Sequence, residues 1–358
     1  MTYQYICRIA LDLAREYESL AVDSLPLSPF TRRYVEDYRT SHDSLRSNWL
    51  RSAHIIYTAL QHAQALPSTT CLIDCGGGQG LLSLLAVKLG FHETIYSDIG
   101  SQMTSDAKAI GHAFGLPANQ YIAGDLDAVA VILADQTEKK YVIVSSNVIE
   151  HVYDLNKLWS ACTALAKNRS LTAVWCSDAN TANPFRVRSR RKFHLYFEHN
   201  DRAPSDWESE LDTRSSYFSL RRSYIKELLP DHSEDDLLRL AKATRGQNYT
   251  DIATTVSNFL ATGQIEYPAH PTNTCNPESG NWCERLIDLD NLSAELRTAG
   301  WQVHLEPGFY GPRSGFLQGN GVALINGVIK LTSPFSLVIS PVYLLTLKKD
   351  ITVDPPCC

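Results

Sequence analysis

Short apolar runs alternate with helical segments between Cys71 and Asp178. The runs CLID, TIYSD, QYIAG, YVIVS and LTAVWCS are short, often β-branched and bounded by Gly, Asp or Asn, which predicts strands. The intervening segments LLSLLAVKLG, MTSDAKAIGHAF and LNKLWSACTALAK are predicted helices, the first of them closed by Gly90. Strand and helix repeated at this spacing indicate a parallel sheet with right-handed crossovers.

The alternation breaks after Asp178 and resumes near residue 285. Between these points lie a helical stretch at about 219 to 246 and a loop rich in Pro, Asn and Cys. LDNLSAELRTAG then predicts a helix capped by Gly300, WQVHLEP a strand, and VYLLTLKK a last strand. The first twenty residues predict an amphipathic helix rather than a signal peptide, because no basic region precedes their apolar positions. We therefore expect an N-terminal helical cap (1–66), a core (67–179 and 285–350) and an inserted substrate-binding or cap subdomain (180–284).

Two features near the C-terminus need separate interpretation. The segment from Val322 to Leu347 is strongly apolar but is interrupted by Asn326, Lys330, Pro334 and Pro341. This pattern predicts a buried helix followed by a core strand, and not a membrane-spanning helix. The final Pro-Pro-Cys-Cys is similar to ends that carry prenyl groups, but a frayed tail is the preferred interpretation of Cys357 and Cys358.

Composition and charge limit the classes of binding partner that the chain can have. The chain has 358 residues, of which 44% are hydrophobic and 20% charged, with a net charge of -6 and a pI of about 6.0. An acidic balance disfavours a polyanion such as nucleic acid as the main partner and favours a small molecule. The nine cysteines include no C-x-x-C pair, which predicts reduced thiols in a cytoplasmic protein.

The segment LIDCGGGQGLL, residues 72–82, carries the first chemical signal. A strand, a glycine turn and a helix start let a ligand approach the backbone, with free N–H groups directed at it. The dinucleotide pattern G-x-G-x-x-G requires glycine at position 81, which is Leu81. The phosphate-loop pattern also fails, since no Lys-Ser or Lys-Thr follows. NAD and ATP are therefore disfavoured.

The pattern that fits is Asp-x-Gly-x-Gly-x-Gly, with Asp74, Gly76, Gly78 and Gly80. It resembles motif I of class I S-adenosylmethionine-dependent methyltransferases. The second strand ends in Asp98, where that family places an acidic residue against the ribose hydroxyls. Gly124-Asp125-Leu126 is similar to the family's adenine-contacting loop, and SSNVIEHVYDL resembles the segment after strand four in quinone-biosynthesis and related small-molecule O-methyltransferases.

The resemblance implies a fold, a cofactor and a set of binding residues. The fold is an α/β, Rossmann-like, seven-stranded doubly wound sheet whose last strands are mixed in direction, with N-terminal helices and a large insertion after strand five. The cofactor is S-adenosylmethionine, and the product is S-adenosylhomocysteine. A carboxylate such as Asp98 can accept two hydrogen bonds from a vicinal diol, whereas Asp74 can orient the loop. The predicted cofactor-binding residues are Asp74, Gly76, Gly77, Gly78, Asp98, Ile99, Asp125, Leu126, Asn147 and Val148.

Glu150 and His151 are the candidate catalytic residues. Methyl transfer needs alignment more than a protein nucleophile, but a hydroxyl acceptor must also lose its proton. His151 is the best candidate base, although it could instead cap a helix or contact the cofactor. Small-RNA 2'-O-methyltransferases hold a metal on a similar segment with a further glutamate where this chain has Asn147. One carboxylate and one histidine make a poor cation site, so no metal is predicted.

The acceptor is predicted to be a hydroxyl on a small molecule. Ser146-Asn147-Val148-Ile149 lacks the Pro-Pro pattern of methyltransferases that act on exocyclic amines. An arginine-rich run could hold an anionic group of the substrate, or could be a solvated face. That run and its aromatic neighbours comprise Phe185, Arg186, Arg188, Arg190, Arg191, Lys192, Phe193, Tyr196 and Phe197.

Several alternatives stay open at this point. His270, Cys275 and Cys283 have spacings of a structural loop more than of a zinc site. A nucleic-acid methyltransferase and a catalytically silent scaffold are the alternative functions. Peripheral membrane contact remains possible, and the sequence does not determine the oligomeric state.

Overall fold

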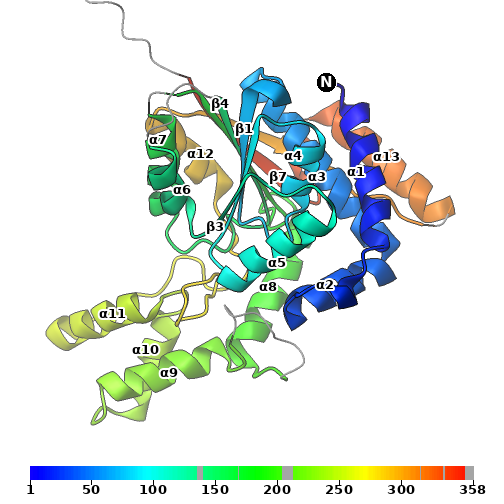
Figure 1. The fold of residues 1–358 in the computed structure, drawn as a ribbon. Helices are drawn as coiled ribbons and strands as arrows, with labels where there is room; N and C mark the ends of the chain where they lie inside the picture. Colours follow the sequence, from blue (N-terminus) through cyan, green and yellow to red (C-terminus); the bar gives the residue numbers. More distant parts are fainter. Residues whose placement is uncertain (135–139, 168, 204–212, 315, 334, 351–358) are drawn as a thin grey trace, which may run out of the picture. The chain divides into compact units, whose positions relative to one another are not determined.

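The computed structural model describes residues 1–134, 140–167, 169–203, 213–314, 316–333 and 335–350 (Figure 1). The chain divides into two compact units. The first unit contains Met1–Ile149, Asp154–Asn183 and the segment from Asp288 onward, and the second contains Glu150–Tyr153 and Pro184–Ile287. The double-cysteine end, Cys357-Cys358, lies outside the described residues.

The first unit is built on one seven-stranded sheet. Its strands are β1 (Thr70–Cys75), β2 (Glu93–Asp98), β3 (Gln120–Ala123), β4 (Lys140–Ser146), β5 (Leu171–Ser177), β6 (Gln302–Pro307) and β7 (Tyr343–Lys349). The strand order is β3-β2-β1-β4-β5-β7-β6. β7 is antiparallel to both neighbours, and the other pairs are parallel. The predicted Rossmann-like, doubly wound sheet with mixed final strands is confirmed.

Helices connect the strands of this sheet. They are α4 (Leu81–Lys88), α5 (Ser101–Ala113), α6 (Leu126–Ile132), α7 (Leu155–Ala166) and α12 (Leu289–Thr298). Gly90 and Gly300 follow α4 and α12 with φ of +76° and +85°, the left-handed conformation of a helix end. The sequence predicted these helices except α6, whose seven residues are too few to show a helical period.

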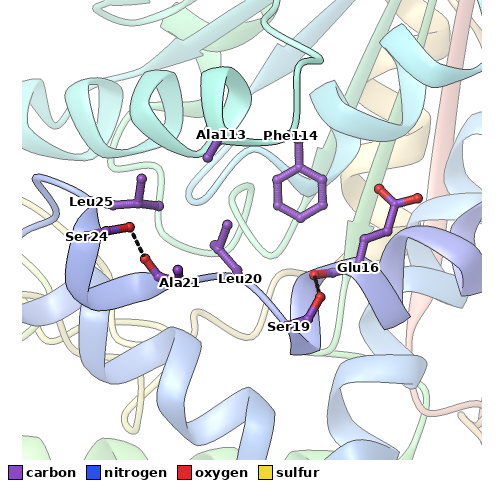
Figure 2. Close-up of a pocket in the computed structure, with 8 residues that line it drawn as sticks. All are labelled: Glu16, Ser19, Leu20, Ala21, Ser24, Leu25, Ala113 and Phe114. Carbon is purple, nitrogen blue, oxygen red and sulfur yellow. Dashed lines mark hydrogen bonds between the residues drawn. The ribbon is translucent and has the colours of Figure 1, made fainter.

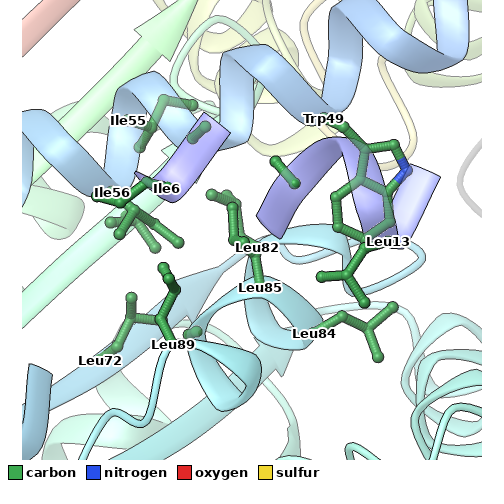
Figure 3. Close-up of a cluster of buried hydrophobic side chains, with 14 of the residues drawn as sticks. Ile6, Leu13, Trp49, Ile55, Ile56, Leu72, Leu82, Leu84, Leu85 and Leu89 are labelled. Atoms are coloured by element: carbon green, nitrogen blue, oxygen red, sulfur yellow. The ribbon is translucent and has the colours of Figure 1, made fainter. Parts of the chain in front are cut away.

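The N-terminal helices α1 (Tyr3–Glu18), α2 (Pro29–Thr40) and α3 (His42–Ala63) belong to the first unit. Figure 3 shows Ile6 and Leu13 of α1 and Trp49 of α3 in one cluster with Leu72 of β1 and Leu85 of α4. Full burial of each such aliphatic side chain contributes roughly 1.5–3 kcal/mol. The N-terminal helices α1 and α3 therefore share an apolar core with the sheet.

The second unit has a helical core of its own. Its helices are α8 (Pro184–His199), α9 (Tyr217–Leu228), α10 (Glu234–Ala243) and α11 (Tyr249–Thr262). The single helical stretch predicted at 219 to 246 is two helices, because Pro230 cannot donate an N–H within a helix and Ser233 caps α10 by accepting from Asp236 N. Ile225, Leu237 and Ile252 pack in the apolar cluster that joins α9, α10 and α11.

A buried ion pair lies within the second unit. Arg221 Nη2 of α9 donates to Glu198 Oε1 of α8 at 2.5 Å, and the two side chains are 0% and 2% exposed. Thr274 Oγ1 also donates to this carboxylate at 2.7 Å, and Arg221 Nε donates to the Ala241 carbonyl at 3.2 Å. Burial by itself would raise the pKa of Glu198, but Arg221 outweighs it and lowers that pKa.

The prediction of a buried helix after Val322 is wrong. Helix α13 (Phe316–Thr332) is present, but among its side chains that the structure describes only Ile329 is fully buried. Asn326 exchanges two hydrogen bonds of 2.9 Å with the backbone of Tyr310. This amide therefore anchors the helix, and several apolar side chains are left in solvent. In the described part of the chain we find no helix with the length and apolar character needed to cross a membrane. The core strand predicted after α13 is confirmed as β7.

Candidate functional site

The glycine loop joins β1 to α4 in the first unit. Gly76, Gly78 and Gly80 have φ of +64°, +52° and +81°, values that side-chain-bearing residues rarely adopt. The N–H groups of Gly76 and Gly77 donate to the Ser97 carbonyl at 2.8 and 3.1 Å. The loop is therefore folded back onto the end of β2.

The glycines of this loop differ in what surrounds them. A Cβ on Gly76 would lie 2.5 Å from Val148 Cγ2, and one on Gly77 would lie 2.4 Å from Tyr96 Cε2. A Cβ on Gly78 would meet nothing within 4 Å. Packing within the protein thus requires the first two glycines, whereas the backbone at Gly78 is open to a ligand.

Asp98 connects three strand ends. Its Oδ2 accepts from Gly78 N at 3.1 Å, and its Oδ1 accepts from Gly100 N at 2.9 Å. Its backbone carbonyl accepts from Gly124 N at 2.8 Å, which brings the end of β3 to the same place. Each carboxylate oxygen can accept more than one hydrogen bond. Asp98 therefore holds the open part of the loop and can still accept from a ligand, while its neighbour Ile99 is 63% exposed.

Asp74 is directed at the start of α4. Its Oδ2 accepts from Ser83 N at 3.0 Å and from Ser83 Oγ at 2.7 Å. The side chain is fully buried, and its Oδ1 forms no hydrogen bond with any described residue. Burial raises the pKa of this carboxyl to about 7, against the lowering effect of the Ser83 donors. These contacts support an orienting role for Asp74.

Replacing Asp74 with asparagine should make stability less dependent on pH. The folded pKa of about 7 lies above the ordinary value of 3.8, so the folded state holds this proton more tightly. That stabilisation is complete below pH 4 and is lost as pH rises through 7. Between pH 5 and pH 8 the wild type should lose roughly 2–3 kcal/mol relative to the Asp74→Asn variant. Urea unfolding of both proteins at the two pH values measures this, and parallel pH profiles would contradict it.

Asp125 and Leu126 begin helix α6. Asp125 caps the helix by accepting from Ala128 N at 3.2 Å, and it also accepts from Lys157 Nζ at 2.8 Å. Partial burial would raise the pKa of Asp125, but the Lys157 and Ala128 donors outweigh it and lower that pKa. Leu126 is 2% exposed. Sequence reasoning missed Lys157, because no short motif links it to Asp125.

Asn147 has an unusual conformation at the end of β4. Its φ is +56°, and its N–H donates to the Cys176 carbonyl at 2.7 Å. Its Oδ1 is buried and forms no hydrogen bond with any described residue. Such a group costs about 1–3 kcal/mol, and a left-handed non-glycine residue adds strain. Because Val148 packs on Gly76, this acceptor lies with the other residues at the strand ends and fits a ligand that carries a donor. We name this group the strand-end cluster; its members are Gly76, Gly78, Asp98, Asp125 and Asn147.

Glu150 and His151 belong to the second unit, where they lie with Glu284. His151 Nδ1 donates to the Trp282 carbonyl at 2.7 Å, so Nε2 is the nitrogen that can accept a proton. One ligand atom from each of Glu150, His151 and Glu284 can be chosen so that all lie within 4.8 Å of one another. Arg190 Nη1 lies 3.7 Å from Glu284 Oε1.

This group has the donor types of a cation site. Two carboxylates and one imidazole can bind a transition-metal dication, but Arg190 already supplies a positive charge beside Glu284. The sequence indicated only one carboxylate and one histidine. Glu284 was missed because it lies far along the chain and no spacing motif connects it to Glu150.

The arginine-rich run lies on helix α8. Arg188, Arg191 and Lys192 are exposed, whereas Arg186 and Arg190 are partly buried. Helical geometry puts residues three or four apart on one face. The run therefore forms these two groups on different faces of α8, and not one continuous cationic surface. Cys275 and Cys283 are buried, and His270 Nδ1 accepts from Asn273 N at 3.3 Å. Among the described residues, these three do not group as metal ligands.

The hollow shown in Figure 2 lies elsewhere in the first unit. It measures about 400 Å³ and lies beside the end of α1, the short helix η1 (Val22–Ser24) and the end of α5. Ser19 and Ser24 donate to carbonyls of their own turns, at 2.9 and 2.7 Å. It contains no residue of the glycine loop, so the strand-end cluster remains the candidate site. The lining residues are Glu16, Ser19, Leu20, Ala21, Ser24, Leu25, Ala113 and Phe114.

The sheet order and the antiparallel β7 agree with the Rossmann-like fold that the resemblance in the sequence implies, with the glycine loop after the first strand. No protein-family model matches this chain, and no curated protein sequence matches it either.

Several solved structures resemble the chain. An S-adenosylmethionine-dependent methyltransferase from Mesorhizobium loti is 13% identical with a TM-score of 0.38, over 82% of this chain and 97% of that chain. A Listeria monocytogenes protein for which the same activity has been proposed is 11% identical with a TM-score of 0.39, over 84% and 99%. A methyltransferase from Clostridium acetobutylicum is 14% identical with a TM-score of 0.29, over 44% and 56%. With identities and TM-scores this low, these likenesses assign no activity to the chain.

Proposed function

We propose that this chain is an enzyme that transfers the methyl group of S-adenosylmethionine to a hydroxyl group of a small molecule. The observation that carries this proposal is the pairing of Asp98 with the open backbone at Gly78, at 3.1 Å. A carboxylate held beside partly exposed backbone that no side chain covers suits a ligand with a vicinal diol and a polar amino-acid end. S-adenosylmethionine has both groups.

The residues around this pair fit the same cofactor. Asp98 would accept from the ribose hydroxyls, and Asn147 Oδ1 supplies a buried acceptor for a ligand donor. Asp125, Leu126 and the exposed Ile99 would lie against the adenine. When bound, the cofactor supplies a methyl group on a sulfonium, which is electrophilic without further activation. The protein residues therefore bind and align, and alignment accounts for most of the rate enhancement.

His151 is the proposed base for the acceptor hydroxyl. The Trp282 carbonyl accepts from Nδ1 and fixes the ring, which places the proton on Nδ1 and makes Nε2 the basic nitrogen of the neutral imidazole. Glu150 is fully buried beside it in sequence, and its carboxylate would stabilise the imidazolium that forms. Arg190 provides the positive charge that balances Glu284, so this arrangement requires no metal ion.

The proposed substrate is a small anionic molecule. Arg188, Arg191 and Lys192 form an exposed cationic group on α8 that suits a phosphate or carboxylate. The division of the arginine run over two helix faces and the net charge of -6 disfavour a nucleic-acid substrate. Open backbone at Gly78 disfavours a silent scaffold. We place the reaction in the cytoplasm, in keeping with nine cysteines that include no C-x-x-C pair.

Calorimetric titration with S-adenosylhomocysteine tests the proposal, with NAD as the control ligand. The wild type should bind S-adenosylhomocysteine and not NAD. Asp98→Ala should weaken binding by about 1–3 kcal/mol, because charge-assisted hydrogen bonds are lost. Asp12→Ala, which changes a partly exposed aspartate of α1 paired with Arg15, should leave the affinity unchanged. Failure of the wild type to bind, or full affinity in a folded Asp98→Ala variant, would refute the assignment.

A further inference from the structure

Helix α13 and the short helix η4 (Phe335–Val338) expose an unusual number of large apolar side chains. Leu324, Leu331 and Phe335 are 71%, 86% and 85% exposed. The set, which we name the α13 face, is Leu324, Ile325, Val328, Leu331, Phe335, Val338 and Ile339. In Figure 1, α13 is the orange helix at the margin of the first unit. Apolar surface gathered in this way marks an interaction site, whereas single exposed apolar residues are common.

The spacing and anchoring of α13 direct this face outward. Leu324, Val328 and Leu331 follow one another at four and three residues, which places them on one side of a helix. The residues that attach α13 to the rest of the first unit are not members of the α13 face. Asn326 bonds to Tyr310, Ile329 is fully buried, and Ser336 Oγ donates to the Ile329 carbonyl at 2.9 Å. The helix is thus attached by other residues, and its apolar side is left to a partner.

The charges of this segment indicate what that partner is. The sequence contains no acidic residue between Glu306 and Asp350, and Arg313 and Lys330 are the charged residues in and next to α13. Asp43 of α3 accepts from Ser314 at 2.7 Å and lies near enough to Arg313 to interact with it, so the exposed Lys330 is the cation on the helix itself. The whole chain carries a net charge of -6, so this segment differs in sign from the rest. A surface that is both apolar and anionic complements it, and a bilayer with acidic headgroups has both properties.

We propose that the α13 face docks this protein on an anionic membrane surface. Helix α13 lies in the interface with its leucines at the acyl boundary, and the Lys330 ammonium reaches the headgroups along its apolar stem. The helix is too short and too interrupted by polar residues to span the bilayer. This inference is independent of the proposed methyl transfer, since none of its residues belongs to the strand-end cluster.

Co-sedimentation with vesicles tests the inference. The full chain is mixed with vesicles of phosphatidylcholine alone or with a third of phosphatidylglycerol. The wild type should bind the anionic vesicles, and binding should fall with added salt. Leu331→Asp and Phe335→Asp should each lower the partition coefficient by about tenfold or more. Leu260→Asp is the matched control, because Leu260 is 57% exposed near the end of α11, and it should bind like the wild type.

Circular dichroism and sedimentation velocity without lipid complete the experiment. Unchanged spectra in the two α13 variants attribute lost binding to the face itself. The proposal is overturned if the wild type binds neither vesicle or binds both equally, or if the α13 variants bind as well as Leu260→Asp. A wild-type dimer that Leu331→Asp dissociates, in the absence of vesicle binding, would assign the face to a second copy of the chain and also overturn it.

Discussion

Replacing Arg221 with methionine is expected to destabilise the second unit by about 3–5 kcal/mol. The variant leaves the Glu198 carboxylate 2% exposed and without the guanidinium that lies 2.5 Å from it. A buried charge that loses its nearest partner keeps most of the cost of leaving water. Arg245 Nε lies farther away, 3.9 Å from Glu198 Oε2, and the Thr274 hydroxyl offsets only part of that cost. Urea unfolding followed by circular dichroism measures the change in the free energy of unfolding.

The neighbouring arginine provides the control for this experiment. Arg222 pairs with Glu234 at 2.6 Å, but those side chains are 46% and 61% exposed. Arg222→Met should therefore change stability by no more than about 1 kcal/mol, because water screens an exposed pair. Equal effects from the two substitutions would show that the Arg221–Glu198 pair is not desolvated in solution.

Replacing His151 with glutamine is expected to lower kcat by roughly 100- to 10,000-fold, the usual contribution of a positioned base. Glutamine keeps a polar group near the Trp282 carbonyl but cannot accept the proton of the acceptor. Affinity for S-adenosylhomocysteine should stay unchanged, because the proposed cofactor contacts are made by Gly78, Asp98 and Asn147. Transfer of a labelled methyl group to hydroxylated acceptors, combined with calorimetry, measures both quantities.

A matched histidine and a chelator sharpen this prediction. His199→Gln changes an exposed imidazole at the end of α8 and should leave kcat unaltered. Wild-type activity should also survive treatment with EDTA, since Arg190 supplies the positive charge beside Glu284. Loss of activity in EDTA that Mn²⁺ restores would instead assign Glu150, His151 and Glu284 to a metal site. Full activity in His151→Gln would exclude the base role directly.

The sheet could be predicted because its signal is local. The predicted strand LTAVWCS at 171–177 matches β5 at every residue. The bounds of β1, β2, β3 and β4 differ from the predicted bounds by one or two residues in all. A strand buried on both faces is a continuous apolar run, and the residues that end it are adjacent in sequence. The positions of Asp74, Asp98 and Asn147 at strand ends could be predicted for the same reason, since they close or directly follow such runs.

Contacts between distant segments could not be predicted in this way. Lys157 reaches Asp125, and Glu284 joins Glu150 and His151, through folding that no spacing in the chain describes. The open space at Gly78 and the crowding at Gly77 also differ only in three dimensions, although both residues are glycines in one loop.

Helix α13 shows most clearly which property of an element its sequence does not predict. Its apolar composition correctly indicated a helix, and the sequence by itself determined that element as it determined the sheet and the glycine loop. Whether the apolar side chains face the core depends on which residues anchor the helix, and Asn326 and Ile329 do so here. Hydrophobicity is a property of each residue, but burial is a property of its neighbours, and those are decided by the tertiary structure.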